Sequence, residues 1–258
     1  MQSTILIQHS FSFYYFSFLA LILLRYFLVA GSTHLLFYSL LTESAAHPKT
    51  PLDSSRKSLI YQDIKLSCLA SVVFALGAAF IIWAYDRGET LLYSDFRYQD
   101  LWYLGVSYGG VLILQDAYFY FVHRILHHPA LFMWLHQGHH KSRQPTAWTS
   151  FAFDLPEAVI QSFFLIAIVF IIPIHFITLI AISITMTFWA VLNHLGLELF
   201  PPAFPHHWLG RWFIGPAHHS IHHRKYTVHY GLYFTFWDRL LGTDDPQYEH
   251  GFGAVLKR

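Results

Sequence analysis

Histidines are concentrated in two places in this 258-residue sequence. Residues 123–140 read HRILHHPALFMWLHQGHH and hold six of the nineteen histidines of the chain. The spacing H-x2-H-H of residues 136–140 recurs at residues 219–223. Histidine is an expensive core residue, because a buried ring nitrogen costs free energy unless it has a partner. This density therefore predicts metal binding.

The spacing also indicates how many metal ions the histidines bind. On a helix, positions i, i+3 and i+4 lie on one face, whereas neighbours such as His139 and His140 diverge by about 100°. This divergence favours two ions over one. Neutral imidazoles ligate iron, copper, zinc or nickel, so the ligand type alone does not select the metal. The candidate ligands are His123, His127, His136, His139, His140, His219, His222 and His223.

The composition is that of a membrane protein. Hydrophobic residues make up 55% of the chain and charged residues only 12%, against about 25% in an average soluble domain. A net charge of +1 and the lack of a basic run argue against nucleic acid as a partner. Cys68 is the only cysteine, which excludes an internal disulfide and any site built from several thiolates.

Long apolar segments predict an all-α fold, a polytopic membrane helix bundle. We expect spans at 13–41, 66–85 and 101–122 and an apolar hairpin at 158–193. The first span is expected to be retained, because no basic region or cleavage site precedes it. It is predicted as one long tilted helix, with two passes split near Arg25 as the alternative.

The apolar stretch 158–193 holds no acidic residue, lysine or arginine. As one straight helix it would measure about 54 Å against a hydrocarbon core of about 30 Å, so it must fold back. Pro173 marks the predicted bend. His175, at that bend, is expected to be an interfacial or core residue. Residues 195–258 contain no further span and are predicted to form a histidine-rich cap, so that 1–258 is a single domain.

Loop charges predict which side of the membrane carries the histidines. Residues 43–65, expected to be an exposed connection, hold four basic residues, and the loop after the second span holds two. The positive-inside rule places 43–65 in the cytoplasm. The third span then returns the chain to that side, so the histidines and the cap are predicted to be cytoplasmic.

Asp116 lies on the same helical stripe as Tyr120, His123 and His127. A carboxylate within an apolar helix is costly unless it is paired. We therefore expect Asp116 to accept a hydrogen bond from a ligand imidazole and to orient it. The alternative is a hydrogen bond that only packs helices together.

The histidine clusters, with NHLG at 193–196 and FWDRLLGT at 236–243, resemble the fatty acid hydroxylase and sterol desaturase superfamily of membrane oxidases. The resemblance covers about residues 115–246. It implies three histidine boxes, at 123–127, 136–140 and 219–223, with His194 as a further ligand. In that family these residues ligate a pair of irons.

The chain departs from the family pattern at two places. Asp154 stands where the family often has a histidine, and is either an oxygen ligand or the sign of a modified site. His229 stands where many members have asparagine, and is either an extra ligand or a neutral replacement. The family also uses a ligand spacing that makes His128 an alternative to His127. We expect the remaining histidines to lie outside the metal site: His206, His207 and His218.

The resemblance implies an enzyme that uses dioxygen and two external electrons to oxidise an unactivated C–H bond of a lipid such as a sterol or fatty acyl chain. The product is an alcohol or an alkene. No GxGxxG fingerprint or fused haem domain is seen, so we expect a separate electron donor: a cytochrome b5-like protein, a ferredoxin or a reductase. The expected location is a bacterial inner membrane or the endoplasmic reticulum.

Two other classes compete with the oxidase. A non-catalytic membrane carrier of haem or metal also needs histidines, but bis-histidine haem sites place them inside neighbouring spans. A zinc hydrolase needs a base, and the sequence contains no H-E-x-x-H motif.

Overall fold

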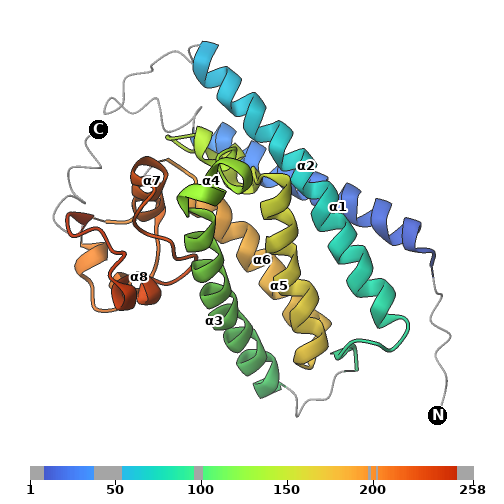
Figure 1. The fold of residues 1–258 in the computed structure, drawn as a ribbon. Coiled ribbons are helices and arrows are strands. Elements are labelled where there is room, and N and C mark those ends of the chain that lie inside the picture. Colours follow the sequence, from blue (N-terminus) through green and yellow to red (C-terminus); the bar gives the residue numbers. More distant parts are fainter. Residues whose placement is uncertain (1–8, 38–53, 96–100, 197–198, 202, 249–258) are drawn as a thin grey trace.

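The computed structural model describes residues 9–37, 54–95, 101–196, 199–201 and 203–248. Long helices form a bundle, and the C-terminal segment with α7 and α8 lies beside α3 (Figure 1). The long helices are α1 (Phe11–Leu35), α2 (Ser54–Tyr85), α3 (Leu101–Leu126), α5 (Leu155–Ile171) and α6 (Phe176–Asn193).

Shorter elements connect these helices and build the histidine-rich end. They are β1 (Leu92–Tyr93), α4 (Pro129–Leu135), the 3-10 turns η3 (His139–Lys141) and η4 (Ala147–Phe151), β2 (Ile174–His175), η5 (Phe204–His206), η6 (Gly210–Trp212), α7 (Pro216–Lys225) and α8 (Phe236–Leu241). The two short strands pair in parallel, and the rest of the described chain is helical or irregular, which confirms the predicted fold class.

Three of the described helices, α1, α2 and α6, are long and apolar enough to cross a membrane, and α5 is a shorter apolar helix. The chain is therefore a membrane protein. The predicted span at 101–122 lies in α3, which is long enough but is not among the three. Gln115, Asp116 and several tyrosines and glycines make it less apolar. Its position as a span stays a prediction.

The first two spans differ in how well they were predicted. Helix α1 is continuous through Arg25, so the split alternative is wrong; residues 38–41 lie outside the described part. Helix α2 begins at Ser54, so the exposed connection predicted at 43–65 is wrong for 54–65. Within this extension Asp63 is buried and accepts hydrogen bonds from the hydroxyls of Ser142 and Thr149.

The hairpin bends where the sequence predicted. Helix α5 ends at Ile171 and α6 begins at Phe176, with Pro173 between them. His175 caps α6, since its Nδ1 accepts the backbone N–H of Ile177 at 3.0 Å, in keeping with a structural role. The β1–β2 pair brings this bend and the loop after α2 to the same end of the bundle.

Helices α3 and α6 run in the same direction and deliver their C-terminal ends to the histidines. Tyr108 of α3 hydrogen-bonds Thr185 of α6 at 2.7 Å, and Tyr103 donates to the carbonyl of Pro173 at 2.8 Å. The buried apolar core between α2, α3, α5 and α6 includes Ile81, Val111, Ile168 and Ile182. This core fixes the relative height of the helix ends that carry the site.

Candidate metal centre

All nine histidines predicted as ligands come together at one end of the bundle, in two adjacent groups. In each group the ligand atoms lie within 4.8 Å of one another. Group 1 is His123, His127, His136, His140 and His222, and group 2 is His139, His194, His219 and His223.

Histidines that are neighbours in the sequence belong to different groups. His139 lies in group 2 and His140 in group 1, and His223 and His222 are divided in the same way. This is the divergence that favoured two ions. Of the two H-x2-H-H boxes, the one at 219–223 lies on an α-helix, α7, whereas the one at 136–140 lies on the end of α4 and the turn η3, so a helix is wrong for it.

The Nε2 atoms of group 1 face one another. His123 and His136 approach to 3.1 Å between their Nε2 atoms, and His140 and His222 also to 3.1 Å. The Nε2 of His127 is buried without a hydrogen-bond partner. The five rings therefore converge on one small volume.

Group 2 is arranged around His194. Its Nε2 lies 3.0 Å from that of His219, 3.3 Å from that of His223 and 3.4 Å from that of His139. The Nε2 atoms of His219 and His223 are 3.1 Å apart. Four ring nitrogens thus meet at a second point.

Most of these rings use their other nitrogen to contact the protein. Nδ1 lies 2.7–3.1 Å from an acceptor in six of them: His123 with the carbonyl of Tyr230, His136 with the carboxylate of Glu157, and His139, His194, His222 and His223 with the carbonyls of Ala152, Ala190, Val228 and Ser142. A carbonyl only accepts, so each Nδ1 that faces one carries the proton, and Nε2 of the neutral ring has a lone pair.

The Nε2 atoms of these rings are therefore hydrogen-bond acceptors, and they lie opposite other acceptors. His194 and His223 both donate through Nδ1 to carbonyls, yet their Nε2 atoms lie 3.3 Å apart. A shared cation removes this repulsion. Two nitrogens about 2.1 Å from one ion, at angles of about 90° to 110°, are about 3.0 to 3.4 Å apart. The observed separations fit one metal ion in each group.

Burial keeps these imidazole rings in the neutral form that binds metal. Removal from water lowers the pKa of His139 to about 4. For the same reason the pKa values of His140, His222 and His223 lie well below the ordinary value for histidine. At neutral pH the rings are uncharged, which is the form that ligates a metal.

Glu157 is a site residue that the sequence analysis missed. It lies in the first turn of α5, is 1% exposed, and places Oε2 2.7 Å from Nδ1 of His136. A carboxylate next to a ligand imidazole sets its tautomer and orientation. The signal was an acidic residue at the start of an otherwise uncharged apolar stretch, which has to be paired.

Asp116 does not have the predicted partner. Its Oδ1 accepts the backbone N–H groups of Leu232, Tyr233 and Phe234 at 3.3, 2.7 and 3.1 Å, and no histidine is among the hydrogen-bond partners found for it in the described residues. The predicted hydrogen bond to an imidazole is wrong, because the Nδ1–H of His123 donates to the carbonyl of Tyr230 instead. Asp116 instead holds the loop that carries this carbonyl.

This contact predicts a mild effect for Asp116→Asn and a large one for Asp116→Leu. Asparagine keeps an acceptor oxygen for the three N–H groups, so metal per chain should stay near the parental value. Leucine leaves those N–H groups unpaired, at about 1–3 kcal/mol each. It should lower the melting temperature and the metal content. Metal analysis and thermal unfolding in detergent measure both. Equal metal loss in the two variants would instead assign a role to the charge.

The residues left open by the sequence lie outside both groups. Asp154 accepts the backbone N–H of Gly138 at 2.7 Å and so holds the turn before His139. His128 is exposed and caps α4 by accepting the N–H of Ala130. His206 and His207 are exposed. Of His127 and His128, it is therefore His127 that lies in group 1.

His218, His229 and Asp244 form a third cluster of possible ligand atoms. The two rings stack face to face, with centroids 3.6 Å apart and planes 10° apart. The Nε2 of His229 already accepts the N–H of Asp245 at 2.8 Å. The ring nitrogens of stacked imidazoles lie in parallel planes. The rings would have to rotate apart before both could bind the same ion. We interpret the pair as packing between α7 and the segment after it.

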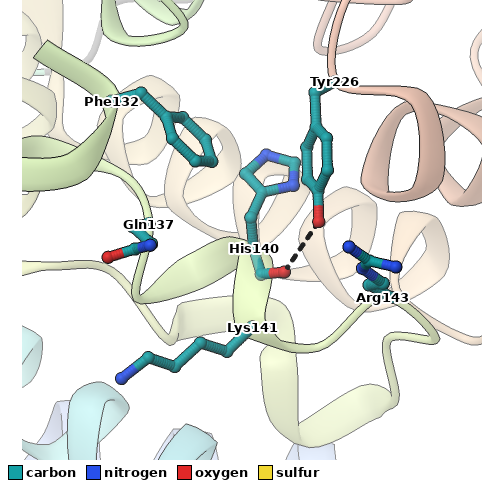
Figure 2. A pocket seen from close by; sticks show the side chains of 6 residues that line it. All are labelled: Phe132, Gln137, His140, Lys141, Arg143 and Tyr226. Atoms are coloured by element: carbon teal, nitrogen blue, oxygen red, sulfur yellow. Dashed lines mark hydrogen bonds between the residues drawn. The ribbon is translucent and has the colours of Figure 1, made fainter. Parts of the chain in front are cut away.

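A pocket with a volume of about 320 Å³ opens on group 1 beside His140. Phe132 and Tyr226 flank the His140 ring, and the Tyr226 hydroxyl lies 3.5 Å from the His140 carbonyl (Figure 2). Lys141 and Arg143 also line the pocket and are exposed. Group 1 is thus reached from a basic surface.

Comparison with known proteins gives a consistent result. The family model described as fatty acid hydroxylase matches residues 109–243, just over half of the chain. The Delta(7)-sterol 5(6)-desaturase ERG3B of Gibberella zeae is 30% identical over 187 residues, which cover 72% of this chain and 56% of that protein. The lathosterol oxidase of Homo sapiens is 30% identical over 203 residues, covering 77% and 66%.

A second fungal relative is the Delta(7)-sterol 5(6)-desaturase erg3C of Aspergillus fumigatus, 30% identical over 206 residues, which cover 71% of this chain and 62% of that protein. The chain thus spans between just over half and about two thirds of the length of these three relatives. No solved structure matches the chain significantly.

Proposed function

Since the chain belongs to the fatty acid hydroxylase family, we propose that it is a membrane di-iron oxidase that uses dioxygen and two external electrons to desaturate or hydroxylate an unactivated C–H bond of a lipid. The observation that carries the proposal is the pair of groups in which buried imidazole nitrogens converge. Because the relatives are named as sterol desaturases and lathosterol oxidases, a sterol is the favoured substrate.

Each group would hold one iron: the five imidazoles of group 1 the first, and the four of group 2 the second. Bound iron supplies the activation of dioxygen, which no amino-acid side chain can supply. The protein orients the imidazoles through the acceptors on Nδ1. Burial of the rings keeps water from the reacting centre.

The electron donor is proposed to approach from the side of Lys141 and Arg143. These cations line the pocket that leads to His140. They favour a partner with an acidic surface, because opposite charges steer association. A cytochrome b5-like protein, a ferredoxin or a reductase remains the expected class of donor.

The haem carrier considered from the sequence is not favoured. A haem between two axial histidines needs a porphyrin-sized space between their rings. In both groups the Nε2 atoms approach to between 3.0 and 3.4 Å, which leaves no such space. A zinc hydrolase is distinguished by the metal bound, since the proposal requires two irons per chain.

The function is tested by comparing the lipids of cells that express the wild-type chain with those of cells that express His223→Ala. We expect a sterol in the first cells that has gained one oxygen or lost two hydrogens. The variant should make neither product, because it lacks one nitrogen of group 2. Identical lipid profiles at equal protein levels would contradict the proposal. Metal analysis of the purified chain tests iron independently.

The proposed topology places Lys57, Lys141 and Arg258 in the cytoplasm and Glu89 on the opposite side. In the structure Glu89 lies in the loop next to β1, at the end of the bundle away from the histidines; Arg258 lies outside the described residues. With Cys68 replaced by alanine, an impermeant thiol reagent should label Lys141→Cys and Glu89→Cys from opposite faces of sealed vesicles. Labelling of both from one face would refute the topology.

A further inference from the structure

The C-terminal segment exposes large apolar side chains that the metal centre does not use. Trp208 is 74% exposed and Leu240 is 60% exposed. We call these residues the interfacial face: Trp208, Leu209, Trp212, Phe236, Leu240 and Leu241.

The two halves of the interfacial face form one unit. Phe213 and Phe234 pair in an antiparallel bridge, and Thr235 donates its N–H to the carbonyl of Trp212 at 3.0 Å. Its hydroxyl donates to the carbonyl of Arg211 at 2.7 Å. The region around η6 and the start of α8 are therefore held together.

The contacts with α6 set the height of this unit along the bundle. Trp189 lies four residues before the end of α6, about 6 Å below the level at which this apolar helix ends. Its ring packs on Phe213 and Tyr233, with centroids 6.1 and 5.6 Å apart. The side chain of Asn193 donates to the carbonyl of Leu232 at 3.2 Å.

The contacts with α3 place α8 somewhat higher, near the end of the apolar helices. Tyr108 and Thr185 are bonded and both helices run toward the site, so Asp116 lies near the level of Asn193. Trp237 of α8 packs on Tyr120 and Phe121, about 6 to 8 Å above that level. In Figure 1, α8 lies beside α3, farther from the α4 end than α7 does.

We propose that the interfacial face inserts into the membrane interface and anchors the C-terminal segment to the bilayer that the helices span. The apolar side of an interfacial segment enters about 5–10 Å into the boundary between headgroups and acyl chains, which is the depth of Phe213 and Tyr233. Tryptophan is the residue typical of that zone.

The charges next to the interfacial face favour contact with lipid headgroups. Arg211 is exposed, and Arg239 lies over the Trp212 ring at 5.9 Å. Guanidinium groups beside an exposed tryptophan ring match the phosphates of lipid headgroups. The anchor holds α7, and with it three of the ligand histidines, at a fixed height above the acyl chains. This inference needs only a membrane protein and does not depend on the proposed reaction.

The test measures the depth of a label on the face. With Cys68 replaced by alanine, Leu240→Cys and the control Thr227→Cys carry a fluorophore in phosphatidylcholine vesicles; Thr227 is exposed two residues after the end of α7 and is not part of the interfacial face. Lipids brominated on the acyl chains should reduce the fluorescence at position 240 about twofold and leave that at 227 nearly unchanged. Unchanged metal per chain shows that each variant is folded.

Trp208→Cys gives a second position on the face if Leu240→Cys does not fold. Equal quenching at the face and at Thr227 would overturn the proposal. So would an unquenched label at position 240 together with a disulfide-linked dimer of the unlabelled Leu240→Cys chain after oxidation in dilute vesicles, because the face would then be covered by a second copy of the chain.

Discussion

Replacing any one of His139, His140, His222 or His223 by alanine should abolish lipid oxidation and lower the bound metal. Each substitution removes one inward nitrogen from a group of four or five. Even the loss of a partner outside the ligand set costs about 10- to 100-fold in affinity or activity. We therefore expect losses of more than about 100-fold for a ligand itself. Metal analysis and product formation measure the two effects.

The two groups make this prediction sharper. His139→Ala should mainly empty group 2, and His140→Ala should mainly empty group 1, although the residues are adjacent in the sequence. His206→Ala is the matched control, since His206 is exposed and outside both groups. Parental activity and metal content in any two of the four ligand variants would refute the assignment.

Glu157→Ala should have the largest effect of any substitution outside the nine histidines. It leaves the Nδ1–H of His136 without its acceptor in a fully buried position. We expect metal affinity in group 1, and activity with it, to fall about 10- to 100-fold. Glu157→Gln keeps an acceptor oxygen and should recover part of the loss. Metal titration of the purified variants gives the affinity directly.

A control on the same helix separates this effect from a general loss of stability. Ser162→Ala removes a hydroxyl that donates to the carbonyl of Val159 within α5, and should leave metal affinity unchanged. If Glu157→Ala lowered the melting temperature but bound metal with parental affinity, Glu157 would serve packing alone. If both groups lost affinity equally, the specific contact with His136 would not explain the result.

The histidines of the site could be named from the sequence because ligation needs a particular side chain. Imidazole is rare, costly to bury and informative in its spacing, so the gathering of His123 with His222 follows from residue types alone. The membrane character was equally accessible, since length and apolarity decide it. Pro173 marked the bend between α5 and α6 because proline cannot continue a helix.

The partners of the histidines could not be read from the sequence. Five of the six Nδ1 atoms with an acceptor face backbone carbonyls, and every residue has a carbonyl. Which carbonyl lies opposite a ring depends on how distant segments pack. His123, for example, meets Tyr230, which is 107 residues away.

The partners of the two acidic residues, Asp116 and Glu157, could not be read from the sequence either. The helical stripe correctly placed Asp116 below His123, but the tertiary structure decided what fills the space between them, and that is the backbone of residues 230–234. Glu157 lacked a local histidine and acquired one when α5 packed beside the turn that carries His136. Periodicity fixes the face of a helix on which a side chain lies, whereas the packing of one element on another decides what it meets there.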